Sequence, residues 1–280
     1  MINLIIHEFR RSLSGKIVCL GLILMPEIML LIGINGVKRS EFGAPSTFEG
    51  ALLGIGMTFL TLAIVGVYLY LCVEAILLLN KDLKSTKGYM LFMTPNSRYK
   101  LLGAKMIMSL ISVLVFMSLS VFLIWLDISS VGEFSDYIFN ELSYRYSRLF
   151  GDIPIWKFIV YYMGSWLLLL SIGGFAVILS KYIKIANTAA RTLVAFIIFF
   201  VMNYVLQYII SKIVAAVTGD MSGTFDSNTL IFGGDTDVFI STASMASALV
   251  GTAIVSVLIA AILFVLNGWL LDAVDRKSVV

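Results

Sequence analysis

A single carboxylic acid interrupts the first long apolar run of the chain. Glu27 follows Pro26 directly, and residues 17–36 around them are almost all apolar. A charged carboxylate at the centre of a membrane-spanning helix costs about 2.5–3.5 kcal/mol. Such a side chain should face other helices or a water-filled cavity, or carry a proton. Two hypotheses stay open: Glu27 belongs to a substrate pathway or gate, or it forms a structural pair with Asn203 or Gln207.

Two further side chains stand out inside apolar runs. Glu74 precedes Asn80 by less than two helical turns, which places it about 9 Å below the end of its run. It can reach basic groups such as Arg10 or Lys105, and we expect a structural ion pair. Trp166 lies deeper in its run than the other tryptophans, where it packs or lines a pathway.

Residue sets for other chemistry are missing from the sequence. The one histidine is His7, and no Cys, His, Asp and Glu set has metal-ligand spacing. Neither Gly-x-Ser-x-Gly nor His-Glu-x-x-His occurs. No phosphate-binding Gly-x-x-x-x-Gly-Lys-Ser/Thr run exists, since Gly15-Lys16 is followed by Ile17. We therefore expect no enzyme and no cofactor bound by this chain.

The composition is that of a protein in contact with membrane lipid. Of 280 residues, 60% are hydrophobic and 13% are charged, and the mean hydropathy is +0.99. A soluble domain has about 25% charged residues. The net charge of +3 gives no nucleic-acid signature. Cys19 and Cys72 fall inside apolar runs, so a disulfide framework is not expected.

Apolar runs of about 20 residues predict helices that cross the roughly 30 Å hydrocarbon core. The sequence predicts an all-α integral membrane protein, one transmembrane domain over 1–280 with an N-terminal amphipathic interfacial helix. The expected segments are an interfacial helix at 2–13, spans at 17–36, 51–79, 101–126, 155–180, 190–217 and 246–271, a cytoplasmic segment at 80–99, and external segments at 127–154 and 218–245. A short helix is expected in 127–154, and turns are expected in 218–245.

The basic residues predict the orientation. With the N-terminus inside, the short inner loops around residues 81–105 and 181–191 are strongly basic. Inner loops of membrane proteins carry an excess of Lys and Arg. We therefore expect both termini in the cytoplasm.

Small residues recur every fourth position in two predicted spans, which lets helices approach closely. Their expected use is packing, within one subunit or between two. The residues concerned are Gly50 and Gly54, and Ser244, Ala248, Thr252, Ser256 and Ala260.

The segment between the second and third spans mixes basic and apolar side chains. Tyr89, Leu91 and Phe92 lie among lysines, and Pro95 then ends the pattern. A purely solvated loop has no need of those apolar groups, whereas a short amphipathic helix that docks on a soluble partner does. The alternative is an ordinary basic inner loop with a helix cap at Ser97.

This segment resembles the membrane subunits of type-2 ATP-binding-cassette exporters. Those subunits often carry a Gly-Tyr-Leu-x-Phe-x-x-Pro-x-Ser-Arg/Lys…Leu-Leu-x-x-Lys run after their second span. The matching residues here are Gly88, Tyr89, Phe92, Pro95, Ser97, Arg98, Leu101, Leu102 and Lys105. The resemblance also covers the wider layout of an interfacial helix, six spans and an external segment before the last span.

The resemblance implies a coupling helix that contacts a separate ATPase subunit, which would bind ATP and Mg. The residues that it assigns to coupling are Asp82, Lys84, Lys87, Gly88, Tyr89, Leu91, Phe92 and Arg98. It further implies a second permease subunit, identical or different, an amphipathic peptide, drug or lipid-like substrate, and a bacterial plasma membrane. Two alternatives remain: a self-standing secondary transporter or channel that uses Glu27, and an intramembrane enzyme, for which the polar residues are too few.

Overall fold

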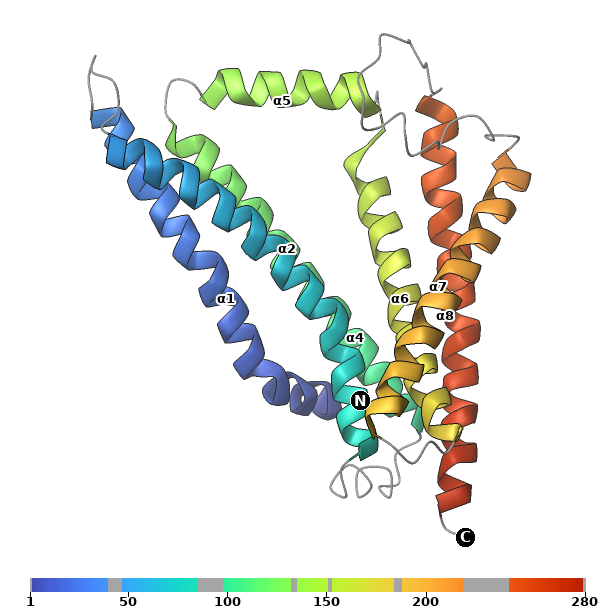
Figure 1. Cartoon of the computed structure of the whole chain (residues 1–280). Helices are drawn as coiled ribbons and strands as arrows, with labels where there is room; N and C mark the ends of the chain where they lie inside the picture. The colour runs from blue at the N-terminus through green and yellow to red at the C-terminus, as the bar shows by residue number, and fades with distance from the viewer. Residues whose placement is uncertain are drawn as a thin grey trace. The chain divides into compact units, whose positions relative to one another are not determined.

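A computed structural model describes the chain over residues 2–39, 47–84, 98–131, 135–150, 153–183, 188–218 and 242–278. Within these ranges the chain forms seven α-helices and no strand (Figure 1). A backbone surrounded by lipid must satisfy its own hydrogen bonds, and long apolar runs therefore fold as helices. The helices are α1 (Ile2–Arg39), α2 (Thr47–Lys84), α4 (Arg98–Ser130), α5 (Ser135–Phe150), α6 (Ile155–Tyr182), α7 (Thr188–Thr218) and α8 (Thr242–Ser278).

Six of these helices are long and apolar enough to cross a membrane. This confirms the predicted all-α fold with six such helices and indicates a multi-pass membrane protein. The apolar stretches are Ile5–Gly36, Gly50–Asp82, Tyr99–Ser130, Ile155–Tyr182, Ala190–Val217 and Ala246–Leu271. α5 is the short helix expected within 127–154, whereas most of the segment 218–245 lies outside the described residues.

The chain forms two compact units, and the division passes through two helices. Unit 1 comprises Met1–Ala75 and Gly103–Leu149, and unit 2 comprises Ile76–Leu102 and Phe150–Val280. α2 and α4 therefore contribute most of their length to unit 1, while the last turns of α2 and the first turn of α4 belong to unit 2.

Unit 1 is built on a buried stripe of α1. The stripe repeats every three or four residues, which is one face of a helix. Its members are Glu8, Ser12, Lys16, Cys19, Ile23, Glu27, Leu30 and Ile34. The apolar side chains of Ile17, Val18 and Met25 are exposed instead. Polar groups inside and apolar groups outside are the arrangement expected of a helix in lipid.

Two glycines allow α1 and α2 to approach closely. A Cβ at Gly56 would lie 2.9 Å from the backbone nitrogen of Leu30, and one at Gly33 would lie 3.0 Å from that of Leu53. At Gly50 and Gly54 a Cβ would meet nothing within 4 Å among the described residues. The packing use of Gly50 and Gly54, within the subunit or between subunits, stays a prediction.

The predicted interfacial segment 2–13 forms the first turns of α1 without a break in the helix. These turns bend away from the rest of α1 in Figure 1. Ser14 and Gly15 lie where this segment joins the span, and Gly/Ser pairs are a common cause of helix kinks. The apolar side chains of Ile6, Phe9 and Leu13 are exposed. Their position in a membrane interface stays a prediction.

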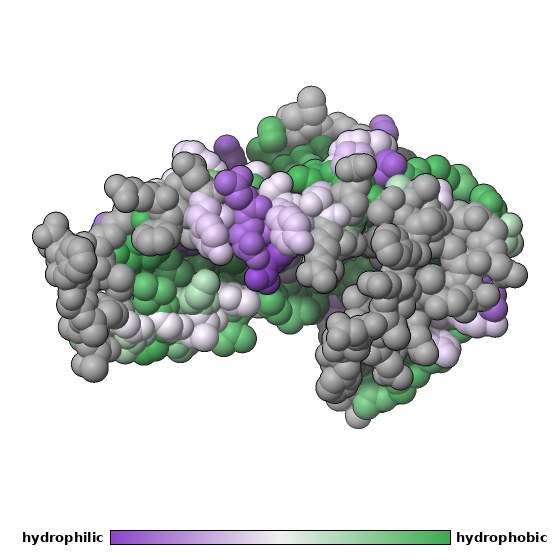
Figure 2. Space-filling view, turned by 90° about the horizontal axis from the view of Figure 1, so that it is seen from above, coloured by the Kyte–Doolittle hydropathy of each residue, from purple (hydrophilic) through white to green (hydrophobic). Residues whose placement is uncertain are grey.

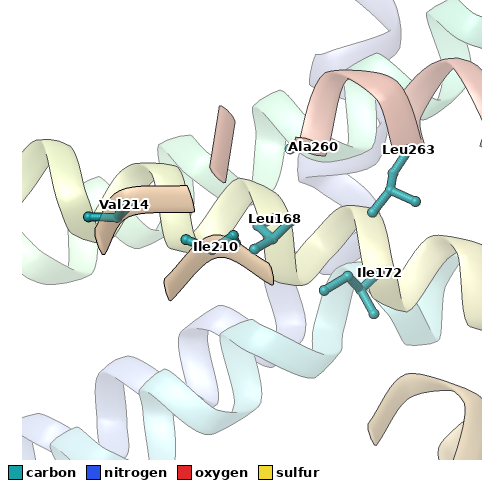
Figure 3. Packing of buried hydrophobic residues seen from close by; sticks show 6 residues of the cluster. All are labelled: Leu168, Ile172, Ile210, Val214, Ala260 and Leu263. Atoms are coloured by element: carbon teal, nitrogen blue, oxygen red, sulfur yellow. The ribbon is translucent and has the colours of Figure 1, made fainter. Parts of the chain in front are cut away.

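Unit 2 packs α6 against α8 and α7 around a shared apolar cluster. Leu168 and Ile172 of α6 meet Ile210 and Val214 of α7 and Ala260 and Leu263 of α8 (Figure 3). The small-residue stripe of α8 contributes to this contact, because Ser171 Oγ donates a hydrogen bond of 3.3 Å to the Ala260 carbonyl. α6 also approaches α8 closely at Gly164, since a Cβ there would lie 3.0 Å from the Ala253 carbonyl oxygen. The predicted packing role of this stripe is thus found within the subunit.

α5 differs from the other helices in composition. Its sequence mixes charged and aromatic side chains, and hydrophilic residues gather over it in the view of Figure 2. Arg145 Nε donates a hydrogen bond of 2.7 Å to Glu141 Oε1 on the solvent side of the helix. This hydrogen bond raises the pKa of Arg145, which stays charged.

Candidate functional site

The interior of unit 1 holds three sets of ionisable side chains. Each set contains one residue of the buried stripe of α1, which is Glu8 in the first, Lys16 in the second and Glu27 in the third. Ionisable groups within membrane-spanning helices are costly and commonly functional. We therefore take the faces of α1, α2 and α4 that meet inside unit 1 as the candidate site.

The first set is a buried ion pair between α1 and α4. Lys105 Nζ donates a hydrogen bond of 3.0 Å to Glu8 Oε1, and the side chains are 4% and 1% exposed. Breaking such a pair leaves one buried charge uncompensated. The pair therefore fixes the register of these helices near the N-terminus of the chain.

The second set surrounds the ammonium group of Lys16. Its Nζ donates to Met108 Sδ at 3.3 Å and lies 4.8 Å from the centroid of the Phe9 ring. The carboxylate of Glu74 supplies the opposite charge. A polarisable sulfur, an aromatic face and a carboxylate together replace much of the water that a lysine would otherwise bind.

Glu74 is in turn held by a tyrosine on its own helix. Tyr70 Oη donates a hydrogen bond of 3.5 Å to Glu74 Oε1, one helical turn away. The Tyr70 hydroxyl occupies the space left by Gly15, because a Cβ at Gly15 would overlap it. Lys16 is thus the basic group whose charge acts on Glu74, whereas the ammonium of Lys105 binds Glu8, and an ion pair of Glu74 with Arg10 stays a prediction.

The third set consists of two carboxyl groups. Glu27 of α1 is 3% exposed and faces Asp127 of α4, close enough for direct electrostatic interaction. Among the described residues, no donor gives a hydrogen bond to either oxygen of Glu27 or to Oδ1 of Asp127. A like-charged pair without a counter-ion is unfavourable, so this set calls for a bound cation or proton.

The other predicted pathway residues lie in unit 2. Trp166 of α6 is buried, and its ring lies 5.8 Å from that of Tyr162, so it packs. Asn203 is half-buried and Gln207 is exposed, both in α7. Glu27 therefore has Asp127 as its neighbour in unit 1, and a pairing with Asn203 or Gln207 stays a prediction.

The predicted coupling residues are described only in part. Asp82 is 1% exposed near the end of α2, and Lys84 and Arg98 are the last residue of α2 and the first of α4. The remaining predicted residues, Lys87, Gly88, Tyr89, Leu91 and Phe92, lie outside the described residues.

Three polar residues, two in unit 1 and one in unit 2, were not predicted from the sequence. Glu8 falls in the predicted interfacial segment 2–13, yet it is buried. Asp127 was placed in an external segment, but α4 continues to Ser130 and includes it. In unit 2, Asn267 is 2% exposed and its Nδ2 donates to the Ser171 carbonyl at 3.0 Å. The sequence feature that could have identified each of them is a single polar residue within or beside an apolar run.

Comparisons with known proteins identify no relative of this chain. No family model matches the chain, and neither a curated protein nor a solved structure does.

Proposed function

We propose that this chain is the membrane subunit of an ATP-driven exporter and that a separate ATPase subunit binds its 80–99 segment. The sequence of that segment is the main support, because Gly88-Tyr89, Phe92, Pro95 and Ser97-Arg98 follow the pattern of such subunits. The orientation from the basic loops puts this segment, together with both termini, in the cytoplasm.

One structural observation carries the proposal further. The end of α2 and the start of α4, which flank this segment, belong to unit 2, whereas the rest of both helices belongs to unit 1. Leu79 and Leu102 anchor the two flanks in a buried cluster with Ile178 and Leu271. A partner that moves the segment therefore acts on α6 and α8 through this cluster, and on unit 1 through the continuous helices α2 and α4.

The mechanism follows from this double connection. ATP binding and hydrolysis in the ATPase would move the coupling segment, and the rigid helices α2 and α4 would carry that movement into the membrane. The buried ion pair of Glu8 with Lys105 keeps α1 attached to α4 during such a movement. A second copy of the chain, or a related subunit, would complete the pathway.

An amphipathic peptide, a drug or a lipid-like molecule is the substrate class that fits best. The spanning helices expose mostly apolar side chains and carry few charged residues, of which Glu8, Lys16, Glu27, Glu74 and Lys105 are buried. A pathway for a small hydrated ion would need more polar lining. The plasma membrane of a bacterium is the proposed location, on the resemblance alone.

Affinity purification in mild detergent tests the proposal. The tagged protein is compared with a Tyr89→Ala, Phe92→Ala double variant, and the co-purifying proteins are identified by mass spectrometry. We expect an ATP-binding-cassette ATPase with the unaltered protein and its loss with the double variant. If the unaltered protein brings down no ATPase under several detergent conditions, the proposal fails, and transport that depends on Glu27 becomes the better hypothesis.

A further inference from the structure

Among the described carboxyl groups inside unit 1, those of Glu27 and Asp127 face neither a basic side chain nor a hydrogen-bond donor that the structure identifies. Glu8 has Lys105, and Glu74 has Tyr70 and Lys16. Glu27 is 3% exposed, and both of its oxygens are buried without a hydrogen-bond partner among the described residues. Asp127 Oδ1 is in the same condition.

The stretches of α1, α2 and α4 beside this pair carry no basic residue, and on α1 the nearest, Lys16 and Lys38, are each eleven positions from Glu27. Glu27 is the only ionisable residue of α1 between Leu20 and Val37, and Asp127 is the only one of α4 between Met106 and Ser130. The stretch of α2 that packs against α1 here, 50–67, carries none, and the nearest ionisable residue before it is Glu49.

α5 follows α4 in unit 1 and carries further charged groups. These are Asp136, Glu141, Arg145 and Arg148, together with the tyrosines at 137, 144 and 146. Arg145 is bound to Glu141, and its side chain is 71% exposed.

We propose that Glu27 and Asp127 are a proton-binding pair that holds one proton between their carboxyl groups. A single proton converts a repelling pair of carboxylates into a carboxylic acid that donates a hydrogen bond to a carboxylate. It needs no cavity and no third ligand. A metal ion needs more ligands, and the described residues contain no group of three or more His, Cys, Asp or Glu that could hold one.

Release of this proton changes the contact between α1 and α4. The two negative charges then repel at short range in surroundings poor in water. α1 is held against α2 near this point, because Leu30 packs on Gly56. Pro26 directly precedes Glu27 and removes one backbone hydrogen bond from α1. Repulsion therefore moves α1 and α4 apart next to Asp127. The packing at this end of unit 1 thus depends on pH.

Infrared difference spectroscopy of the purified protein in lipid nanodiscs tests the proposal without an ATPase or a transported compound, so it is independent of the proposed function. Spectra are recorded while the pH is raised from about 5 to about 9. We expect the carbonyl band of a protonated carboxylic acid to disappear on titration. Glu27→Gln should abolish this band, and Asp127→Asn should abolish it or shift its midpoint. Glu141→Gln, on the exposed ion pair of α5, should leave it unchanged.

Thermal unfolding of the same samples supplies the second readout. The melting temperature of the unaltered protein should fall by about 2–6 °C as the proton is lost, and Glu27→Gln should remove this dependence because an amide donates to Asp127 at every pH. A carboxylic-acid band that persists unchanged in Glu27→Gln overturns the proposal. So does a protein that is stabilised through Glu27 by added Na⁺, Mg²⁺ or Ca²⁺ and not by acid.

Discussion

Lys105 and Glu8 are joined by an ion pair of 3.0 Å although they stand almost a hundred residues apart, and their side chains are 4% and 1% exposed. The pair connects the first turns of α1 to α4, close to the point where α4 passes from unit 2 to unit 1. It combines a charge-assisted hydrogen bond with nearly complete exclusion of water, so its two members depend on each other.

Removal of one member of this pair should cost more than removal of both. Lys105→Met leaves the Glu8 carboxylate buried without a counter-charge and should destabilise the protein by about 3–5 kcal/mol. The double variant Glu8→Leu, Lys105→Met should recover most of this loss. Unfolding in detergent, followed by tryptophan fluorescence, gives the free energies of unfolding of the unaltered protein, of Lys105→Met and of the double variant.

The exposed pair of α5 is the matched control for that prediction. Arg145→Met breaks an ion pair of similar length, 2.7 Å, whose side chains are 71% and 40% exposed. Exposed pairs contribute little, so this variant should unfold like the unaltered protein. Equal losses for Lys105→Met and Arg145→Met would contradict the burial described for Glu8 and Lys105.

Gly15 should tolerate no side chain. A Cβ there overlaps the Tyr70 hydroxyl, which is bonded to Glu74, and Gly15→Ala should therefore destabilise the protein by about 1–3 kcal/mol. Adding Tyr70→Phe removes the overlapping oxygen and should restore part of the loss. Gly21→Ala on the same helix meets nothing within 4 Å and should be neutral or slightly stabilising. A Gly15→Ala variant as stable as Gly21→Ala would refute this contact.

Gly164 should be equally sensitive in unit 2. A side chain at this position meets the backbone of Ala253, including its carbonyl oxygen at 3.0 Å. Gly164→Leu forces α6 and α8 apart and should cost about 1–3 kcal/mol or more. Gly66→Leu on α2, where a Cβ meets nothing within 4 Å, is the control. Thermal unfolding in the same detergent compares them, and similar melting temperatures would speak against the α6–α8 contact.

The spans could be predicted because lipid makes length and apolarity sufficient evidence. The predicted 155–180 and 190–217 correspond closely to Ile155–Tyr182 and Ala190–Val217. The end of the third span was less accurate, because a helix can extend past its apolar run. Asp127 therefore falls in the predicted external segment 127–154, although α4 continues to Ser130.

The partners inside unit 1 could not be predicted from the sequence. Glu8 and Asp127 become neighbours of Lys105 and Glu27 only when α1 and α4 pack in one register. Composition and periodicity give the face of each helix, but not which residue on a neighbouring helix it meets. Small residues show the same limit, since Gly56 and Gly33 form the α1–α2 contact, whereas a Cβ at Gly50 or Gly54 would meet no described residue within 4 Å.

Site-directed photocrosslinking in intact cells tests the proposed function most directly. A photoreactive phenylalanine analogue replaces Tyr89 in the predicted coupling segment, and a control protein carries it in place of Trp269, a residue of α8 that is 63% exposed. Our account predicts a crosslink from position 89, and not from position 269, to a protein that mass spectrometry identifies as an ATP-binding-cassette ATPase. Expression of both proteins at the same level without any ATPase crosslink from position 89 would contradict the account.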